Sequence, residues 1–317
     1  MDITVIGAGM AGLAVIEKIK AKEPASRITL IDKNQYYFNR FDCLNKITEF
    51  KWKKISELAE YHRVNFTGAE VERINFKRKK IFLKDSNPID FELLIIATGL
   101  KSKKISARGQ HREGFFYLDR IDPFKIRDFI KVSNEAAVSV STFLGLKLAF
   151  ALKNRIKEVR VIAENLDFLG DEKDVVLGNL ALRGIHAHIN CSLEEVIGEG
   201  GVKAIKIEPF KVFSSQLVLI DSGFYPNRNF SDEELNKHDY LFTDYSGVYL
   251  IGDAARDNIE NDYFFTSASG YIEMQADWLV KKIFKEETEP LKIEALTAEQ
   301  KKNAIDELCK VNEVYEA

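Results

Sequence analysis

The sequence predicts an α/β fold in which short parallel strands alternate with helices. Three observations support this prediction. An apolar strand runs directly into a glycine-rich turn and a helical pattern at residues 3–13, a similar strand–turn–helix pattern recurs at residues 135–149, and short apolar strands end in small residues near 97 and 252. With 317 residues, 45% of them hydrophobic and 30% charged, the chain is long enough for two compact domains.

The first turn has the spacing G-x-G-x-x-G, formed by Gly7, Gly9 and Gly12 with Met10 and Ala11 inside it. Gly7 permits the tight turn, Gly9 lets a pyrophosphate approach the backbone, and Gly12 lets the helix pack closely on the strand. The free N–H groups and the dipole of the following helix N-terminus favour an anion at this place. The motif therefore predicts a bound diphosphate.

An acidic residue follows the second strand at the spacing that a ribose-binding carboxylate requires. The strand at residues 27–31 ends in Asp32, which lies 20 residues after Gly12, and Lys33 beside it is a further candidate ligand contact. Strand, glycine turn, helix and acid together predict a Rossmann-like dinucleotide-binding domain.

Two later strands end in short motifs that narrow the choice of dinucleotide. One ends in the turn Ala97-Thr98-Gly99 and the other in Gly252-Asp253. With the first glycine turn and Asp32, in this order, they resemble the pyridine nucleotide–disulfide oxidoreductase family. The resemblance covers about residues 1–285, and the most similar members are the NADH:rubredoxin, ferredoxin and nitrite reductase flavoproteins.

The resemblance implies a non-covalent FAD in the first domain. In the family, the Ala-Thr-Gly turn closes the FAD domain beside the adenine diphosphate. Gly252 then leaves room for the ligand, and the Asp253 carboxylate accepts a hydrogen bond from the ribityl chain or diphosphate; a helix N-cap is the alternative role for Asp253. Family members also point a helix N-terminus at the flavin pyrimidine ring, and here Thr266 and Ser267 are the candidates for that position.

The resemblance also implies that the second domain is inserted in the first. Residues 1–105 and 227–285 are predicted to form the FAD domain, residues 106–226 a degenerate NAD(P)H-binding-like domain, and residues 286–317 a linker and a helical tail. The tail begins with a capping box, Thr297-Ala298-Glu299-Gln300, followed by apolar residues at helical spacing. We expect this helix to bury its apolar stripe on the FAD domain or against a second subunit.

The second glycine turn has lost two of its three glycines. When Gly145 is aligned with the third glycine, Val140 and Thr142 occupy the first two positions. Val140 is β-branched and disfavours a positive φ, and Thr142 places a Cβ where a pyrophosphate must approach. Glu164, after the next strand, still matches the expected acid. The sequence therefore predicts an intact fold with a damaged phosphate cradle, and NAD(P)H binding is doubtful.

A Lys–Glu pair near the flavin is also altered relative to the family. Lys147 stands at the Glu position, and Lys46 is the candidate for the Lys, in a segment with Arg40 that resembles the family motif Y-x-R-P-x-L-S-K. Two lysines cannot form this ion pair, so they either disfavour each other's charge or attract an anion; alternatively, Lys147 extends to solvent. Cys43, in the same segment, is a candidate redox thiol or else a packing residue.

Composition excludes several other classes of function. The net charge of −3 argues against a nucleic-acid partner, and the strand-length apolar runs argue against a membrane span. Three scattered cysteines without a C-x-x-C motif argue against a redox dithiol and for a reducing, cytoplasmic setting. His186 and His188 have no third partner in the sequence, so we expect no metal site.

The sequence thus predicts an FAD-dependent oxidoreductase that exchanges electrons with a small redox protein or a small-molecule donor or acceptor, as a monomer or a homodimer. Two alternatives remain open. One is an NAD(P)H-dependent flavoprotein reductase with a reshaped nicotinamide pocket, and the other is a non-catalytic FAD-binding module or sensor.

Overall fold

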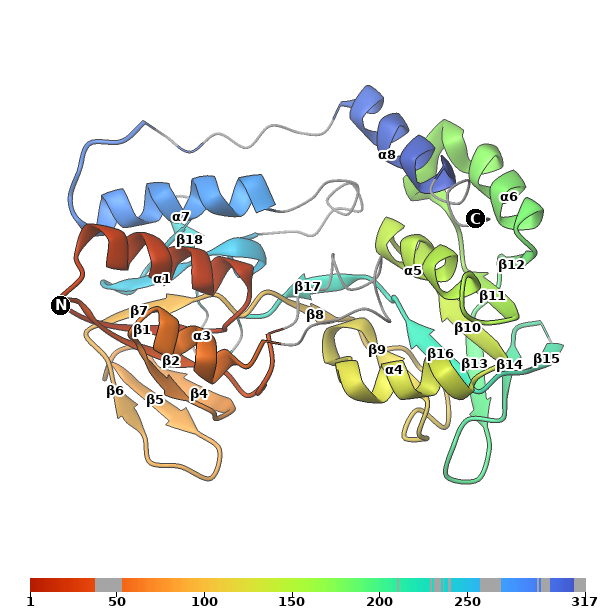
Figure 1. Ribbon diagram of the computed structural model, residues 1–317, viewed down its shortest axis with the longest axis horizontal. Helices are drawn as coiled ribbons and strands as arrows, with labels where there is room; N and C mark the ends of the chain where they lie inside the picture. Colours follow the sequence, from red (N-terminus) through yellow and green to blue (C-terminus); the bar gives the residue numbers. More distant parts are fainter. Residues whose placement is uncertain are drawn as a thin grey trace.

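In the computed structural model, two α/β lobes lie side by side (Figure 1). The structure describes residues 1–37, 53–209, 211–228, 230, 235, 237–238, 241–256, 269–289, 291 and 297–310.

The first lobe is built on a seven-stranded sheet with the order β18-β19-β20-β7-β1-β2-β3. Strands β1, β2, β3, β7 and β20 pair in parallel, and the central strands β1 and β7 are almost completely buried, as their continuous apolar sequences predict. Helices α1 and α7 pack together over this sheet (Figure 1). The elements of the sheet and its helices are β1 (Asp2–Ile6), α1 (Met10–Lys22), β2 (Arg27–Ile31), α3 (Ile55–Tyr61), β3 (Asn65–Thr67), β7 (Leu93–Ile96), β18 (Lys237–His238), β19 (Phe242–Thr243), β20 (Val248–Leu250) and α7 (Ser269–Ile283). A small antiparallel sheet adds β4 (Val71–Asn75), β5 (Lys80–Leu83) and β6 (Ile89–Asp90).

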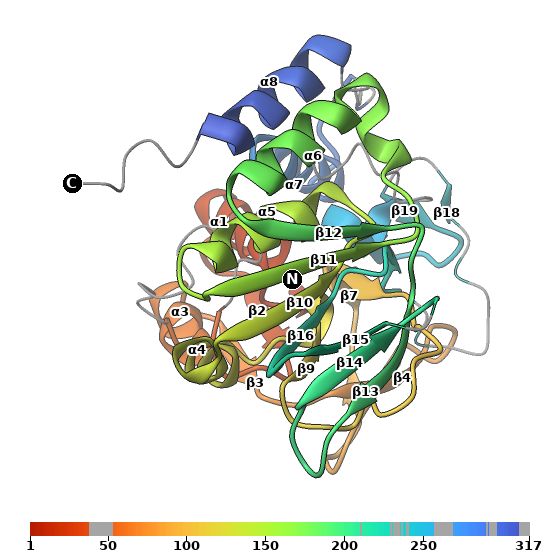
Figure 2. The ribbon, with the colours of Figure 1, turned by 90° about the vertical axis from the view of Figure 1, so that its right-hand side faces the viewer.

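The second lobe repeats the plan with a five-stranded parallel sheet in the order β12-β11-β10-β16-β9 (Figure 2). A separate antiparallel sheet, β13-β14-β15, leads from β12 to β16. The elements of the lobe are β9 (Phe115–Tyr117), α4 (Pro123–Val132), β10 (Glu135–Ser139), α5 (Phe143–Lys153), β11 (Glu158–Ala163), α6 (Lys173–Leu182), β12 (Ile185–Ile189), β13 (Leu193–Ile197), β14 (Ala204–Ile207), β15 (Lys211–Ser214) and β16 (Leu217–Ile220).

The chain crosses between the lobes twice, through β8 (Leu100–Ser102) and β17 (Phe224–Pro226), which pair with each other antiparallel. The sheet of the second lobe is therefore formed by strands that lie in the sequence between β8 and β17. The sheet of the first lobe is formed by strands that precede β8 and strands that follow β17. The predicted fold class, with two Rossmann-like domains and the second inserted in the first, is confirmed. The exact domain boundaries stay predictions.

The tail forms the predicted helix, α8 (Ala298–Lys310), and its capping box is complete. The Thr297 N–H donates to Gln300 Oε1 at 2.9 Å, and the Gln300 N–H donates to Thr297 Oγ1 at 3.2 Å. Val311 and Tyr315, which continue the predicted apolar stripe, lie outside the described residues.

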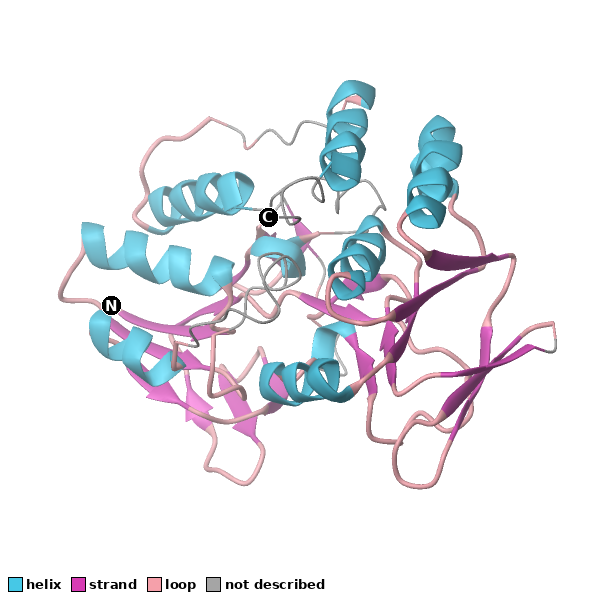
Figure 3. Cartoon of the chain, turned by 45° about the vertical axis from the view of Figure 1, so that its right-hand side comes forward, coloured by secondary structure: helices cyan, strands magenta, loops and turns pink. Residues whose placement is uncertain are grey.

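The expected docking of the tail on the FAD domain is wrong, because α8 lies against α6 of the second lobe (Figures 1 and 2). Figure 3 shows the helices and strands of both lobes from another side. Ile305 is buried in this contact, and the Arg183 guanidinium donates to the Cys309 carbonyl oxygen. Periodicity showed that one face of α8 must be covered; it carried no information about which lobe covers it.

Among the helices of the described ranges, none is long and apolar enough to cross a bilayer.

Replacing Ile305 with alanine is expected to lower the free energy of unfolding by about 2–5 kcal/mol, because a buried branched side chain is truncated. Denaturant titration measures the change. The control is Lys302→Ala on the exposed face of the same helix, which should change stability by less than about 0.5 kcal/mol. Equal stabilities of the two variants would show that the α8 contact does not form in solution.

Candidate functional site

The first glycine turn is tightly packed at two glycines and open at the third. Gly7 has a φ of +104°, and a Cβ added there would lie 2.4 Å from the Ala97 carbonyl oxygen. A Cβ on Gly12 would lie 1.9 Å from the Gly7 carbonyl oxygen, whereas a Cβ on Gly9 would meet no described atom within 4 Å. Gly7 and Gly12 therefore hold the turn together, and Gly9 borders open space, as a ligand-binding position requires.

The helix that follows this turn has a free N-terminus among the described residues. Gly9 is the N-cap of α1, and no side chain caps the helix. Met10 and Ala11 form its first turn. The first N–H groups of a helix need acceptors, and an anion supplies them in many nucleotide sites.

Asp32 is held beside this turn by the backbone. Its Oδ2 accepts from the Ala8 N–H at 2.7 Å, and its Oδ1 accepts from the Asn34 N–H at 2.8 Å. The carboxylate is thus held beside the first glycine turn, and its predicted contact with a ribose hydroxyl stays a prediction. The Lys33 ammonium instead pairs with Glu70 at 2.9 Å, which lowers the pKa of Glu70, so a role of Lys33 in ligand binding stays a prediction.

Predicted residues that follow β7 and β20 lie beside the same turn and α1. Ala97, at the end of β7, touches Gly7 and Gly12, and the Thr98 hydroxyl donates to the Asn227 carbonyl oxygen. A Cβ on Gly252 would lie 2.7 Å from the Ala11 Cβ, so this glycine allows close contact with α1. Gly99 completes the Ala-Thr-Gly turn with a φ of +67°.

Asp253 directly follows Gly252 in the sequence, and both lie in a short 3-10 helix, η3 (Gly252–Ala255). The N-cap of η3 is Ile251, and α7 begins only at Ser269, so the alternative role of Asp253 as a helix N-cap is wrong. Gln275 was missed by the sequence analysis. It is completely buried on α7 and accepts from the Gly252 N–H at 2.9 Å, and a single buried amide within a helix gives no motif to find it.

Five predicted residues, Arg40, Cys43, Lys46, Thr266 and Ser267, lie outside the described residues, and their roles stay predictions. Lys147 is described, and its ammonium lies 5.0 Å from the centre of the Phe143 ring. Burial lowers the pKa of Lys147, while Glu307 on α8 acts in the opposite direction. Its side chain is therefore partly buried between α5 and the tail rather than freely extended into solvent.

The second turn can be aligned with the first through its backbone hydrogen bonds. The Gly7 N–H donates to the Ile31 carbonyl oxygen at 2.8 Å, and the Val140 N–H donates to the Ile162 carbonyl oxygen at the same distance. Val140 therefore occupies the place of Gly7. Val140 is buried and is absent from the residues with positive φ, so this turn has a different backbone conformation from the first.

The same comparison matches Asp221 with Ala97. The Ala97 N–H donates to the Ile6 carbonyl oxygen at 2.8 Å, and the Asp221 N–H donates to the Ser139 carbonyl oxygen at 2.9 Å. The sequence Asp-Ser-Gly after β16 thus repeats the Ala-Thr-Gly after β7. This repeat was the signal in the sequence that could have identified Asp221, which the motif search missed.

Asp221 is completely buried, and its carboxylate faces the N-terminus of α5. Its Oδ2 accepts from the N–H groups of Ser141 at 3.2 Å, Thr142 at 2.8 Å and Gly145 at 3.1 Å, and from the Thr142 hydroxyl at 2.9 Å. A Cβ on Gly145 would lie 2.5 Å from the same oxygen. The second turn is therefore filled where the first is open.

The expected acid of the second domain is displaced by one residue. Because Ile162 matches Ile31 in the strand register, Ala163 stands in the place of Asp32. Strand β11 extends through Ala163, and Glu164 follows it with an exposed side chain. The prediction that Glu164 matches the ribose-binding acid is wrong.

The burial of Asp221 predicts a pH dependence of stability. Burial raises its pKa from 3.8 to about 6, against the hydrogen bonds from Thr142, Ser141 and Gly223. Because the folded-state pKa lies above the unfolded value, the stabilising contribution is complete below about pH 4 and is lost as the pH rises through about 6. Between about pH 4 and pH 6, the free energy of unfolding of the wild type should fall by about 3 kcal/mol relative to that of Asp221→Asn. Urea unfolding at several pH values measures this difference. A free energy of unfolding that rises with pH over this range would mean that the hydrogen bonds to Asp221 lower its pKa by more than burial raises it.

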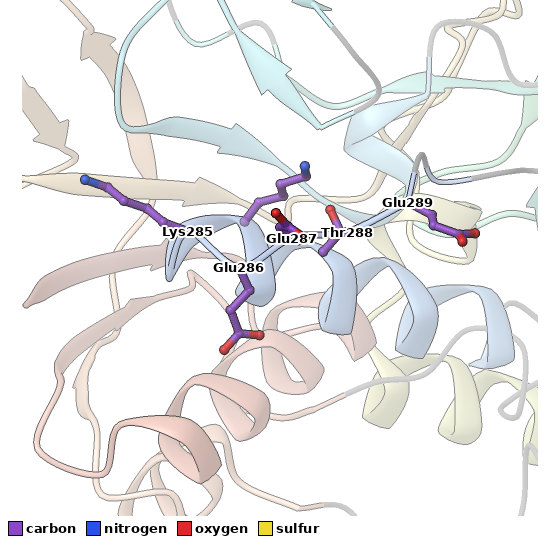
Figure 4. Close-up of a pocket in the computed structure, with 6 residues that line it drawn as sticks. Lys285, Glu286, Glu287, Thr288 and Glu289 are labelled. Atoms are coloured by element: carbon purple, nitrogen blue, oxygen red, sulfur yellow. The ribbon is translucent and has the colours of Figure 1, made fainter.

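A surface depression at the far end of α1 does not belong to this site (Figure 4). Glu286 in its wall pairs with Lys22, which is the last residue of α1. The first glycine turn lies at the opposite end of α1, directly before its first residue, Met10. Its lining is mostly charged: Lys282, Lys285, Glu286, Glu287, Thr288 and Glu289.

Comparison with known proteins gives matches over most of the chain. Residues 1–268 match the family model described as pyridine nucleotide-disulphide oxidoreductase. The chain is 22% identical over 278 residues to the ferredoxin–NAD(+) reductase subunit of the benzene 1,2-dioxygenase system of Pseudomonas putida, covering 80% of this chain and 67% of that protein. It is 24% identical over 279 residues to a rubredoxin–NAD(+) reductase of Ectopseudomonas oleovorans, covering 80% of this chain and 72% of the relative.

Solved structures share the fold. An NAD-dependent persulfide reductase from A. fulgidus superposes with a TM-score of 0.78 at 19% identity, covering 96% of this chain and 65% of that one. A putidaredoxin reductase in covalent complex with putidaredoxin superposes with a TM-score of 0.77 at 15% identity, covering 92% of this chain and 76% of that one. The chain spans between 45% and 72% of the length of the curated relatives that it matches.

Proposed function

Because this chain belongs to the pyridine nucleotide-disulphide oxidoreductase family, we propose that it is an FAD-dependent oxidoreductase that passes electrons to or from a redox partner protein. The observation that carries the proposal is the open first glycine turn: among the residues that the structure describes, no atom lies within 4 Å of a Cβ placed on Gly9, and no side chain caps α1. Bound FAD would supply the electron-accepting and electron-donating chemistry.

The residues around this turn fit the adenine dinucleotide part of FAD. The N-terminus of α1 would bind the diphosphate, and Asp32 would accept a hydrogen bond from a ribose hydroxyl. Gly252 allows η3 to lie close to α1, and Asp253 on η3 would accept a hydrogen bond from the ribityl chain or the diphosphate. The backbone holds Asp32 through Ala8 and Asn34, so this carboxylate is fixed before a ligand arrives.

The partner is proposed to be a small redox protein, because several relatives are named as reductases of ferredoxin or rubredoxin. A small-molecule donor or acceptor is the alternative partner. Two further features stay proposals: a cytoplasmic location, which rests on the scattered cysteines, and a homodimer, which rests on the amphipathic pattern of the tail helix.

An NAD(P)H-dependent reductase with a reshaped nicotinamide pocket remains the second candidate, because the same relatives are named as NAD(+) reductases. The first domain fits this reading equally well, so the two candidates differ only in the second domain. There, Val140 is buried at the first glycine position and Asp221 fills the turn, and both features favour the partner-protein reading.

The proposed function is tested by identifying the flavin and its reductant. Flavin released by heating the purified protein should co-migrate with FAD on chromatography. Anaerobic mixing with a chemically reduced ferredoxin or rubredoxin should then bleach the flavin absorbance. Recovery of FMN would contradict the FAD assignment, and an FAD that no carrier reduces would favour a non-catalytic FAD-binding module.

A further inference from the structure

The two dinucleotide-type turns of this chain differ in what lies at the helix N-terminus. At α1 the described residues place no side-chain cap. At α5 the Thr142 hydroxyl caps the Leu144 N–H at 3.2 Å, and the Asp221 Oδ2 accepts from three backbone N–H groups. These backbone N–H groups are the kind that bind a diphosphate in Rossmann-like folds.

We propose that Asp221 is a built-in anion that takes the place of a dinucleotide diphosphate in the second domain and so determines that this domain excludes nicotinamide dinucleotides. The inference does not depend on the flavin, because it concerns only the α5 turn. Asp221 stands where Ala97 stands in the first domain, and this single difference replaces a methyl group by a carboxylate at the centre of the turn.

The contacts of Asp221 reproduce those of a phosphate oxygen. One carboxylate oxygen accepts four hydrogen bonds between 2.8 and 3.2 Å, and three of the donors are backbone N–H groups around the start of α5. The helix dipole favours a negative charge at this point and acts against the effect of burial. Because the pKa of Asp221 is about 6, the carboxylate is ionised at neutral pH. The carboxylate is completely buried and accepts from the Gly145 N–H at 3.1 Å, and even a Cβ added to Gly145 would lie only 2.5 Å from it. A diphosphate therefore cannot enter without displacing the carboxylate.

Two other changes agree with a closed site. The turn no longer adopts positive φ at Val140, and Ala163 has replaced the acid at the ribose position. A domain that merely tolerated the loss of glycines would leave the helix N-terminus unsatisfied. Here the donors have acceptors, so the turn has been rebuilt around an internal anion.

Chemical rescue tests this proposal in the full-length, FAD-loaded protein. Asp221→Ala gives the second turn the side chain of Ala97, leaves the N–H donors without an acceptor, and should lower the melting temperature by about 5 °C or more. Added sulfate or pyrophosphate should then restore part of the lost melting temperature, and the effect should saturate with anion concentration. Sodium chloride at equal ionic strength is the reference.

The matched control is Leu219→Ala, on β16, the strand that directly precedes Asp221; this change creates a buried apolar cavity and no anion site. Any general stabilisation by sulfate appears equally in this control and in wild type. Rescue of Asp221→Ala beyond that level supports the proposal. A folded Asp221→Ala protein that anions stabilise no more than the control would overturn it.

A second measurement needs no variant. Calorimetric titration of the FAD-loaded wild type with ADP-ribose should show no binding up to millimolar concentration, because the first turn holds FAD and the second holds Asp221. Binding at micromolar concentration would overturn the proposal even if Asp221→Ala failed to fold. Both readouts are independent of electron transfer, so failure here and failure of the proposed redox function are distinguishable.

Discussion

Replacing Gly9 with valine is expected to abolish FAD binding while the protein still folds. A side chain at this position meets no described protein atom within 4 Å, so the fold accommodates it, but it occupies the space that the diphosphate needs. We expect the affinity for FAD to fall by about 100-fold or more, since several hydrogen bonds of roughly 1 kcal/mol each are lost. Flavin absorbance of the purified protein and a titration with FAD measure the effect.

Two matched glycines separate ligand exclusion from unfolding. Gly178, on α6, also has open space around its Cβ position, so Gly178→Val should retain flavin. Gly12→Ala should instead fail to fold, because its Cβ would lie 1.9 Å from the Gly7 carbonyl oxygen. A Gly9→Val protein that keeps its flavin would show that the diphosphate does not bind at this turn.

NADH is expected to reduce the flavin about 100-fold or more slowly than a carrier protein does, without saturation, because the second domain cannot bind its diphosphate. Anaerobic stopped-flow absorbance with NADH and NADPH measures this rate. Changing Val140 and Thr142 together to glycine should not accelerate it, because Asp221 still fills the turn.

The decisive variant adds Asp221→Ala to these two glycine changes. Reduction by NADH should then become faster and begin to saturate, although Lys147 remains beside Phe143 on α5. Fast, saturable reduction of the wild type at micromolar NADH would show that the second turn binds the dinucleotide in spite of Asp221.

Patterns that lie within one short segment were predictable from the sequence. The first glycine turn, the capping box of α8 and the strand–turn–helix pattern of the second domain each depend on residues fewer than twenty positions apart, and each is present in the structure. The inserted second domain was implied by the family resemblance, which itself rests on short motifs of this kind. Such patterns report local geometry directly.

Features that depend on pairing between distant segments were not predictable in this way. Asp221 reaches the α5 turn only because β16 pairs with β10, and its role became visible once the register was known. The misplacement of Glu164 has the same origin, because the register matches Ile162 with Ile31, and β11 then continues one residue further than β2 before Glu164. For α8, the amphipathic pattern fixed the buried face but not the surface that covers it.

The built-in carboxylate at Asp221 also changes how the stability of the chain depends on its surroundings. A domain that binds a free ligand gains stability in proportion to the logarithm of the ligand concentration, so its unfolded fraction follows the metabolic state of the cell. An anion attached to the chain has no concentration to vary. If Asp221 takes the place of a diphosphate as proposed, the second lobe keeps its anion at every ligand concentration, whereas the stability of the first lobe, through Gly9 and α1, is expected to follow the supply of flavin.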